Sequence, residues 1–98
     1  MRITDIIWKE RTVGKLADKH SVSVTEAEEV LLSRPVVRRM TKGHVRGEDV
    51  YAALAQLRNG RYLIVFFIDK KRGVALPISA RDMAPSEREY YAKHTQQG

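Results

Sequence analysis

Four side chains in this sequence are of kinds that move protons or neutralise negative charge, and they are the candidates for catalysis: His20, Arg46, Glu48 and Arg81. An imidazole or a carboxylate can take a proton from a hydroxyl, and a guanidinium can hold a phosphate through two parallel N–H donors. RNA carries its own nucleophile, the 2′-OH. An enzyme that cleaves it needs to align that hydroxyl with the phosphorus, remove its proton and stabilise the charge on the phosphate. The four residues therefore suit metal-free RNA cleavage, although any basic domain contains such side chains.

The stretch ISARDMAPSEREYY places Ser79 and Arg81 where a strand-like run gives way to a helix. Backbone N–H groups at the start of a helix lack partners within the helix and attract anions. An arginine beside them can hold a phosphate, so this junction is a candidate binding site. The alternative is that Arg81 pairs with one of the neighbouring carboxylates (Asp82, Glu87 or Glu89) and only closes this corner of the fold.

Four more side chains are predicted to bind nucleic acid: Lys15, Lys19, Ser79 and Arg88. Lys15 and Lys19 are four residues apart, so they lie on one side of a predicted helix and can contact phosphates. The alternative for these two lysines is a solvated stripe. The alternative for Arg88 is a structural role in packing or pairing on the last helix.

The catalytic candidates have structural alternatives as well. His20 falls on the apolar side of its predicted helix, so it is either a half-buried histidine or an acid–base group that titrates near neutral pH. Arg46 and Glu48 lie in one loop, where they either pair with each other or face a cleft together. Trp8 is expected in the core, where its large apolar surface is best buried.

The composition indicates a polyanionic partner. The 98 residues contain 18 Lys and Arg against 12 Asp and Glu, which gives a formal net charge of +6. Such an excess favours nucleic acid, an anionic membrane surface or an acidic protein, although a basic surface without a dedicated partner is also compatible. No apolar run reaches the length of a signal peptide core or a membrane span, so a cytoplasmic protein without membrane contact is expected.

No motif for a metal or a cofactor is present. The chain has no cysteine, and its three histidines fall on different predicted elements. The sequence also lacks a Walker loop, a GxGxxG fingerprint and a GxSxG elbow. We therefore expect neither a cofactor nor a bound metal.

The elements that must position these side chains follow from local patterns. Residues 23–26 form a capping box that predicts a helix over 24–32, and Asn59-Gly60 predicts a hairpin between two strands. The run LIVFFI is apolar throughout, so its strand is expected at the centre of the sheet. Pro77 requires an edge or a bulge in the following strand, and Pro85 suits the first turn of the last helix. The full expectation is strands at 3–8, 35–40, 50–57, 61–69 and 74–79, helices at 9–20, 24–32 and 84–94, and a loop at 41–49.

This order, β-α-α-β-β-β-β-α, predicts an α+β fold in which helices pack on a curled antiparallel sheet. Ninety-eight residues suit a single domain, 1–98, and residues 95–98 are expected to form a disordered tail.

Several short motifs, taken in order, resemble the BrnT family of toxins from toxin–antitoxin systems. They are Lys19-His20, Val22-Ser23, Glu26-Ala27, Ile78-Ser79-Ala80-Arg81 and Glu87-Arg88, and the resemblance runs from Trp8 to Tyr91. It implies a small ribonuclease with a fold similar to the RelE-like toxins. It also implies neutralisation by a BrnA-type antitoxin and repression of the pair's own promoter by the complex, so that the toxin meets DNA only through the antitoxin.

The chain departs from the family pattern at several places. Lys9 follows the tryptophan where the family usually has Asp, Ser21 replaces a frequent glycine, and Arg34 replaces an acidic residue. The family's arginine shortly after Gly-Glu is missing, and Arg46 is its possible substitute. The alternative function is therefore a catalytically inactive BrnT-like module that acts through a partner protein or in a DNA-binding repressor complex.

Overall fold

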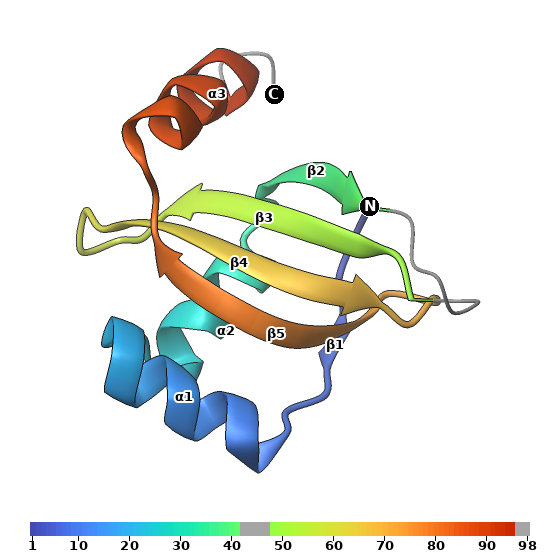
Figure 1. Cartoon of the computed structure of the whole chain (residues 1–98). Coiled ribbons are helices and arrows are strands. Elements are labelled where there is room, and N and C mark those ends of the chain that lie inside the picture. Colours follow the sequence, from blue (N-terminus) through green and yellow to red (C-terminus); the bar gives the residue numbers. More distant parts are fainter. Residues whose placement is uncertain (42–47, 96–98) are drawn as a thin grey trace.

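The computed structural model describes residues 1–41 and 48–95, which form one sheet with helices on both of its faces (Figure 1). The elements are β1 (Asp5–Ile6), α1 (Glu10–His20), α2 (Val24–Leu32), β2 (Val36–Thr41), β3 (Val50–Gln56), β4 (Tyr62–Asp69), β5 (Val74–Asp82) and α3 (Pro85–Thr95). The predicted α+β class and element order are confirmed. The further likeness to RelE-like toxins stays a prediction. Most of the expected loop, including Arg46, lies outside the described residues, as does the tail beyond Thr95, which itself ends α3.

The sheet has the strand order β1-β5-β4-β3-β2. The strand β4 is central as predicted, and the hairpin between β3 and β4 turns at Asn59-Gly60, where Gly60 has a φ of +95°. The strands β2 to β5 form the expected antiparallel sheet, and β1 adds to its edge in parallel with β5. The first strand is shorter than expected. Next to this short ladder, Thr4 and Asp5 donate backbone hydrogen bonds to the Gly73 carbonyl, and Ile7 donates to that of Ala75.

The strand β5 contains the bulge that Pro77 predicts. Phe67 pairs with Pro77 and Phe66 pairs with Ser79, so Ile78 is the extra residue. The strand then continues to Asp82, three residues beyond its expected end. Ser79 and Arg81 therefore belong to the last residues of the strand, which ends at Asp82 shortly before α3 begins at Pro85.

One face of the sheet is covered by α1 and α2 and holds the larger core. Leu16, Val22, Val30 and Leu31 pack there with side chains from β3, β4 and β5, among them the fully buried Phe67. The helix α2 begins at its predicted capping box, because the Ser23 hydroxyl accepts from the Glu26 N–H and the Glu26 carboxylate accepts from the Ser23 N–H. Of the predicted apolar side of α1, Leu16 is buried, Val13 and His20 are half-buried, and Ala17 is exposed.

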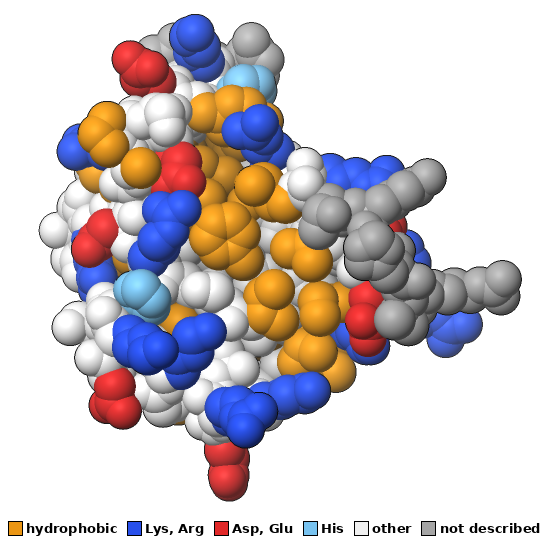
Figure 2. All heavy atoms as spheres, viewed as in Figure 1, with side chains coloured by type: hydrophobic (Ala, Val, Ile, Leu, Met, Phe, Trp, Pro, Cys, Tyr) orange, Lys and Arg blue, Asp and Glu red, His pale blue; other side chains and the backbone are white. Residues whose placement is uncertain are grey.

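The opposite face is covered only in part, by α3. None of residues 85–95 is buried, and α3 packs on β2 and β3 (Figure 1). A smaller core forms here from Ala52, Leu54, Ile64 and Met83, with half-buried aromatic side chains around it. Figure 2 shows an apolar area over the strands between the helices, bordered by Lys and Arg side chains. We call this side of the sheet the α3 face.

Candidate functional site

Two of the predicted catalytic residues, Arg81 and His20, come from elements on different sides of the sheet. Arg81 pairs with Ile64, whose side chain belongs to the core of the α3 face. Asp82, the next residue, pairs with Leu63 and points toward α1 and α2. His20 ends α1 and therefore belongs to the helix-covered side. His20 nevertheless lies near Asp82, the residue next to Arg81, since Arg61 donates both to the His20 carbonyl and to the Asp82 carboxylate.

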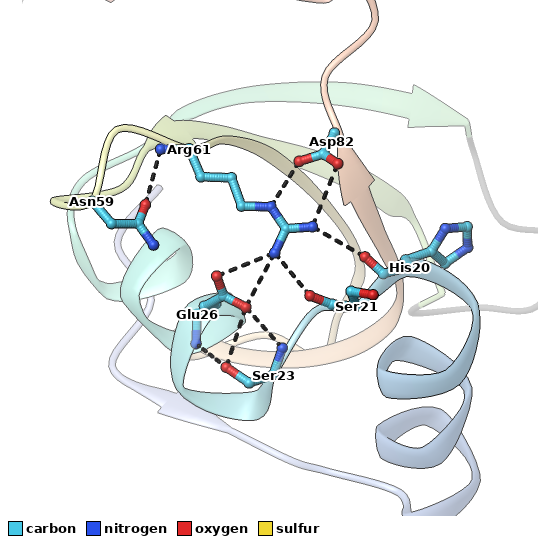
Figure 3. A network of polar contacts seen from close by, with 7 residues as sticks. All are labelled: His20, Ser21, Ser23, Glu26, Asn59, Arg61 and Asp82. Carbon is cyan, nitrogen blue, oxygen red and sulfur yellow. Dashed lines mark hydrogen bonds and ion pairs between the residues drawn. The ribbon is translucent and has the colours of Figure 1, made fainter.

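Arg61 forms the densest polar network on the helix-covered side (Figure 3). Its Nε donates to the Asp82 carboxylate at 2.7 Å, and its Nη1 donates to the Glu26 carboxylate at 3.2 Å. The same guanidinium donates to the backbone carbonyls of Ser21 at 2.8 Å and His20 at 3.0 Å. One side chain therefore links the end of α1, the start of α2 and the end of β5.

The charges in this network shift the pKa values of its members. Hydrogen bonds from Arg61 hold the pKa of Asp82 below its ordinary value. The Ser23 backbone N–H lowers the pKa of Glu26, and Arg61 lowers it further. Sequence reasoning missed Arg61. The one local signal was its place directly after the hairpin glycine, where a long side chain can reach neighbouring elements.

The lysines predicted to bind nucleic acid stand apart from this network. Lys15 and Lys19 are exposed on α1. The His20 imidazole is turned away from the Arg61 guanidinium (Figure 3), while the His20 carbonyl accepts the bond described above. The three side chains thus form a basic edge of the helix-covered side.

Arg81 forms a close ion pair with Glu87 on the α3 face. Its Nη1 and Nη2 donate to the two carboxylate oxygens at 2.7 and 2.8 Å. The Glu87 carboxylate also accepts from the Ala84 N–H at 2.7 Å, and therefore occupies the start of α3 that was expected to be open for an anion. The bond from Arg81 lowers the pKa of Glu87, so the pair stays charged at neutral pH. The alternative that Arg81 pairs with a neighbouring carboxylate is thus the observed geometry.

Three arginines on the α3 face stack over aromatic rings. The Arg81 guanidinium carbon lies 5.4 Å from the ring centroid of Phe66. The corresponding distance is 4.8 Å from Arg38 to Tyr90 and 4.0 Å from Arg88 to Tyr62. Such contacts hold a guanidinium in place while its N–H groups still point outward from the ring plane edge, as those of Arg81 do toward Glu87. The α3 face therefore combines fixed positive charge with flat apolar surfaces.

The other predicted residues fall at different distances from Arg81. Ser79 pairs with Phe66 on β4, two residues before Arg81, and so shares the α3 face. Glu48 precedes β3, whose first residue, Val50, pairs with Ile68. Ile68 is four residues from the partner of Arg81 along β4, about 13 Å at the usual rise of a strand. Glu48 is therefore not brought to Arg81, and Arg46 lies outside the described residues.

Two further findings concern metals and membranes. Within residues 1–41 and 48–95, no three His, Asp or Glu side chains gather in a way that would hold a metal ion. Among the helices of these same residues, none is long and apolar enough to cross a membrane.

Comparison with known proteins identifies the family. Residues 8–87 match the family model described as "Ribonuclease toxin, BrnT, of type II toxin-antitoxin system". No curated protein matches the chain. The family implies a ribonuclease toxin with RNA as its substrate and an antitoxin protein as its partner. Because the match covers most of the chain and follows the motifs given above, the protein belongs to the BrnT family of type II toxin–antitoxin ribonuclease toxins.

Proposed function

We propose that the chain is a metal-independent endoribonuclease that acts in the cytoplasm through a site on the α3 face. The proposal further assigns it a small DNA-binding antitoxin of the BrnA type, so that it meets DNA only through that partner. The observation that supports the site is the set of three arginines, Arg38, Arg81 and Arg88, each stacked on an aromatic ring of one sheet face. A face of this kind offers positive charge to a backbone and flat surfaces to bases.

In the proposed reaction Arg81 exchanges its carboxylate partner for the scissile phosphate. Carboxylate and phosphate both accept two parallel N–H bonds, so the guanidinium can pass from Glu87 to the substrate without losing bidentate contact. The released Glu87 carboxylate then lies beside the phosphate and takes the proton from the 2′-OH. Attack of that oxygen on phosphorus forms a 2′,3′-cyclic phosphate and breaks the bond to the 5′-oxygen, which takes a proton from water and leaves as a hydroxyl, while Arg38 adds a second positive charge.

The remaining site residues keep their predicted roles within this proposal. Ser79 offers a hydroxyl beside Arg81 on β5, and Arg88 binds the strand of RNA along α3. Lys15, Lys19 and His20 form a basic edge that an extended RNA can reach from the other side. His20, Arg46 and Glu48 stay predictions as catalytic residues, and His20 is the alternative base to Glu87.

The second candidate is an inactive module that binds a partner protein or serves in a DNA-binding repressor complex. The bidentate pair itself favours it, because the guanidinium of Arg81 is already satisfied by Glu87. In that case the pair closes the corner between β5 and α3 and contributes only to folding.

Variants of Arg81 separate the two functions. For an active enzyme, Arg81→Ala should lower RNA cleavage roughly 10²-fold or more, the usual effect of removing one stabiliser of transition-state charge. Arg81→Lys should give an intermediate loss, since it keeps the charge without the bidentate fork. Arg11→Ala, which removes an exposed arginine from α1, is the control and should cleave at the wild-type rate. Cleavage is followed on a labelled RNA with and without chelator, and melting is measured on the same samples.

Wild-type cleavage by a well-folded Arg81→Ala protein would end the assignment of Arg81. Loss of cleavage in chelator would refute the metal-free mechanism. Comparison of Glu87→Gln with His20→Asn identifies the base, because only the variant that removes it should lose the acidic limb of the pH profile.

A further inference from the structure

A pocket lies beside α3, where the helix faces the ends of β3 and β4. It measures about 460 Å³, and its walls include Gln56, Tyr62, Arg88, Glu89 and Tyr91. The catalytic proposal uses Arg88 only as a contact to the RNA strand and gives this pocket no role.

The walls of the pocket are flat and held in place. The rings of Tyr62 and Tyr91 meet edge to face, with centroids 6.1 Å apart. The Arg88 guanidinium lies 4.0 Å from the Tyr62 ring centroid. A guanidinium stacked in this way is itself a platform, because a nucleobase can stack on an arginine plane as it does on an aromatic ring.

The polar groups of the pocket include acceptors as well as the N–H donors of Arg88. The Gln56 side-chain amide donates through Nε2 to the Gly60 carbonyl at 3.2 Å, which fixes its orientation and leaves Oε1 as an acceptor. The Tyr91 hydroxyl oxygen accepts the Gln56 backbone N–H at 3.3 Å. Glu89 adds a carboxylate, which only accepts when ionised. A flat ring with an N–H donor on its edge can therefore bond to the Gln56 Oε1 or to Glu89.

The pocket lies close to Arg81. Tyr62 is two residues from Ile64, the partner of Arg81, which corresponds to about 7 Å along β4. A phosphate held by Arg81 therefore leaves the adjoining base within reach of the Arg88 platform.

We infer that this pocket is a subsite for one unpaired nucleobase of the RNA, next to the scissile phosphate. The inference rests on the proposed function, since it takes Arg81 as the phosphate ligand. It makes single-stranded RNA the substrate class, because a paired base cannot leave its stack to enter the pocket without an added free-energy cost. The acceptors favour a base with an exocyclic amino group over uracil, whose edge has one N–H between two carbonyls.

The test compares variants of the platform in two measurements. Arg88→Ala removes the platform, and Arg88→Lys keeps the charge without the plane. Both should raise KM for single-stranded RNA roughly tenfold, as loss of one stacked base does, while kcat stays near the wild-type value. Lys93→Ala, which removes an exposed charge further along α3, is the control and should leave both constants unchanged. A duplex of the same sequence should be a poor substrate for every variant.

The second measurement needs no cleavage. Titration of wild-type protein with cytidine, adenosine and uridine monophosphates should shift the ring signals of Tyr62 and Tyr91 in NMR spectra, and uridine should shift them least. If Arg81→Ala abolishes cleavage but Arg88→Lys retains the wild-type KM and the nucleotides leave both rings unshifted, the subsite is refuted while the proposed function stands. If neither the wild type nor any variant cleaves RNA but the ring signals of the wild type respond to nucleotides, the pocket binds bases and the catalytic proposal fails.

Discussion

At the scale of single residues, Arg61 carries the strongest expectation for stability. Its side chain is 23% exposed and links two carboxylates with two backbone carbonyls. Arg61→Met keeps the length of the side chain but leaves these acceptors unpaired. We expect it to cost about 2 kcal/mol of unfolding free energy, or roughly 10 °C in Tm for a domain of this size. Arg58→Met, an exposed arginine in the same hairpin, is the control and should change Tm little.

The same variant has an expected pH dependence. The pKa values of Asp82 and Glu26 are lowered in the folded state, so their contribution to stability is complete above the unfolded-state values, near pH 4 to 5. It is lost as the pH falls through the lowered values. The difference in Tm between wild type and Arg61→Met should therefore shrink below about pH 4. A difference that stays constant down to pH 2 would show that these carboxylates are not the partners that matter.

Some residue contacts could be predicted from the sequence and others could not. The bond between Ser23 and Glu26 spans three residues, so the capping box was readable. The partners of Arg61 lie 21 to 41 positions away, and two of them are backbone carbonyls that no side-chain pattern reveals. Glu87 was one of three carboxylates considered for Arg81, and only the fold shows which one lies in reach.

At the scale of elements, Gly73 joins the first strand to the sheet. Its φ is +79°, and an added Cβ would lie 2.8 Å from the Thr4 Oγ1 and 3.1 Å from the Arg2 carbonyl oxygen. Gly73→Ala should therefore cost about 1–2 kcal/mol and release β1, which faster hydrogen exchange of the Thr4, Asp5 and Ile7 amides would report. Gly14→Ala is a control of opposite sign. The added Cβ at this position in α1 would meet no atom within 4 Å. Because alanine favours a helix over glycine, the variant should stabilise the fold by about 0.5–1 kcal/mol.

Elements with local signals were predicted well, and those set by distant partners were not. The bounds of α2 and the hairpin turn follow from a capping box and an Asn-Gly pair, and both are confirmed. The parallel pairing of β1 depends on a strand almost 70 residues later in the chain, which no local pattern encodes. The last residues of β5, Ala80 to Asp82, look like a loop in sequence because Arg81 and Asp82 are charged. They continue the strand because the backbone of β4 from Leu63 to Val65 pairs with them.

At the scale of the whole molecule, the net charge of +6 predicts that RNA binding depends on salt. For single strands the slope of log K against log salt is about −0.7 for each phosphate neutralised. Removing Arg38 or Arg88 should therefore reduce the slope by about 0.7, measured with an uncleavable 2′-deoxy oligonucleotide. Removing Arg11 should leave it unchanged. Equal changes from all three arginines would mean that the overall charge attracts RNA without a defined path on the α3 face.

The bulge at Ile78 decides which residue of β5 belongs to the candidate site. With the bulge, Arg81 pairs with Ile64 and points to the α3 face. In a regular strand continued from the pair of Pro77 and Phe67, Arg81 would instead pair with Leu63 and point to the helices. Two neighbouring residues of opposite charge would then exchange sides. When related chains are aligned here, a gap misplaced by one residue between Pro77 and Asp82 would assign the role of the arginine to an aspartate.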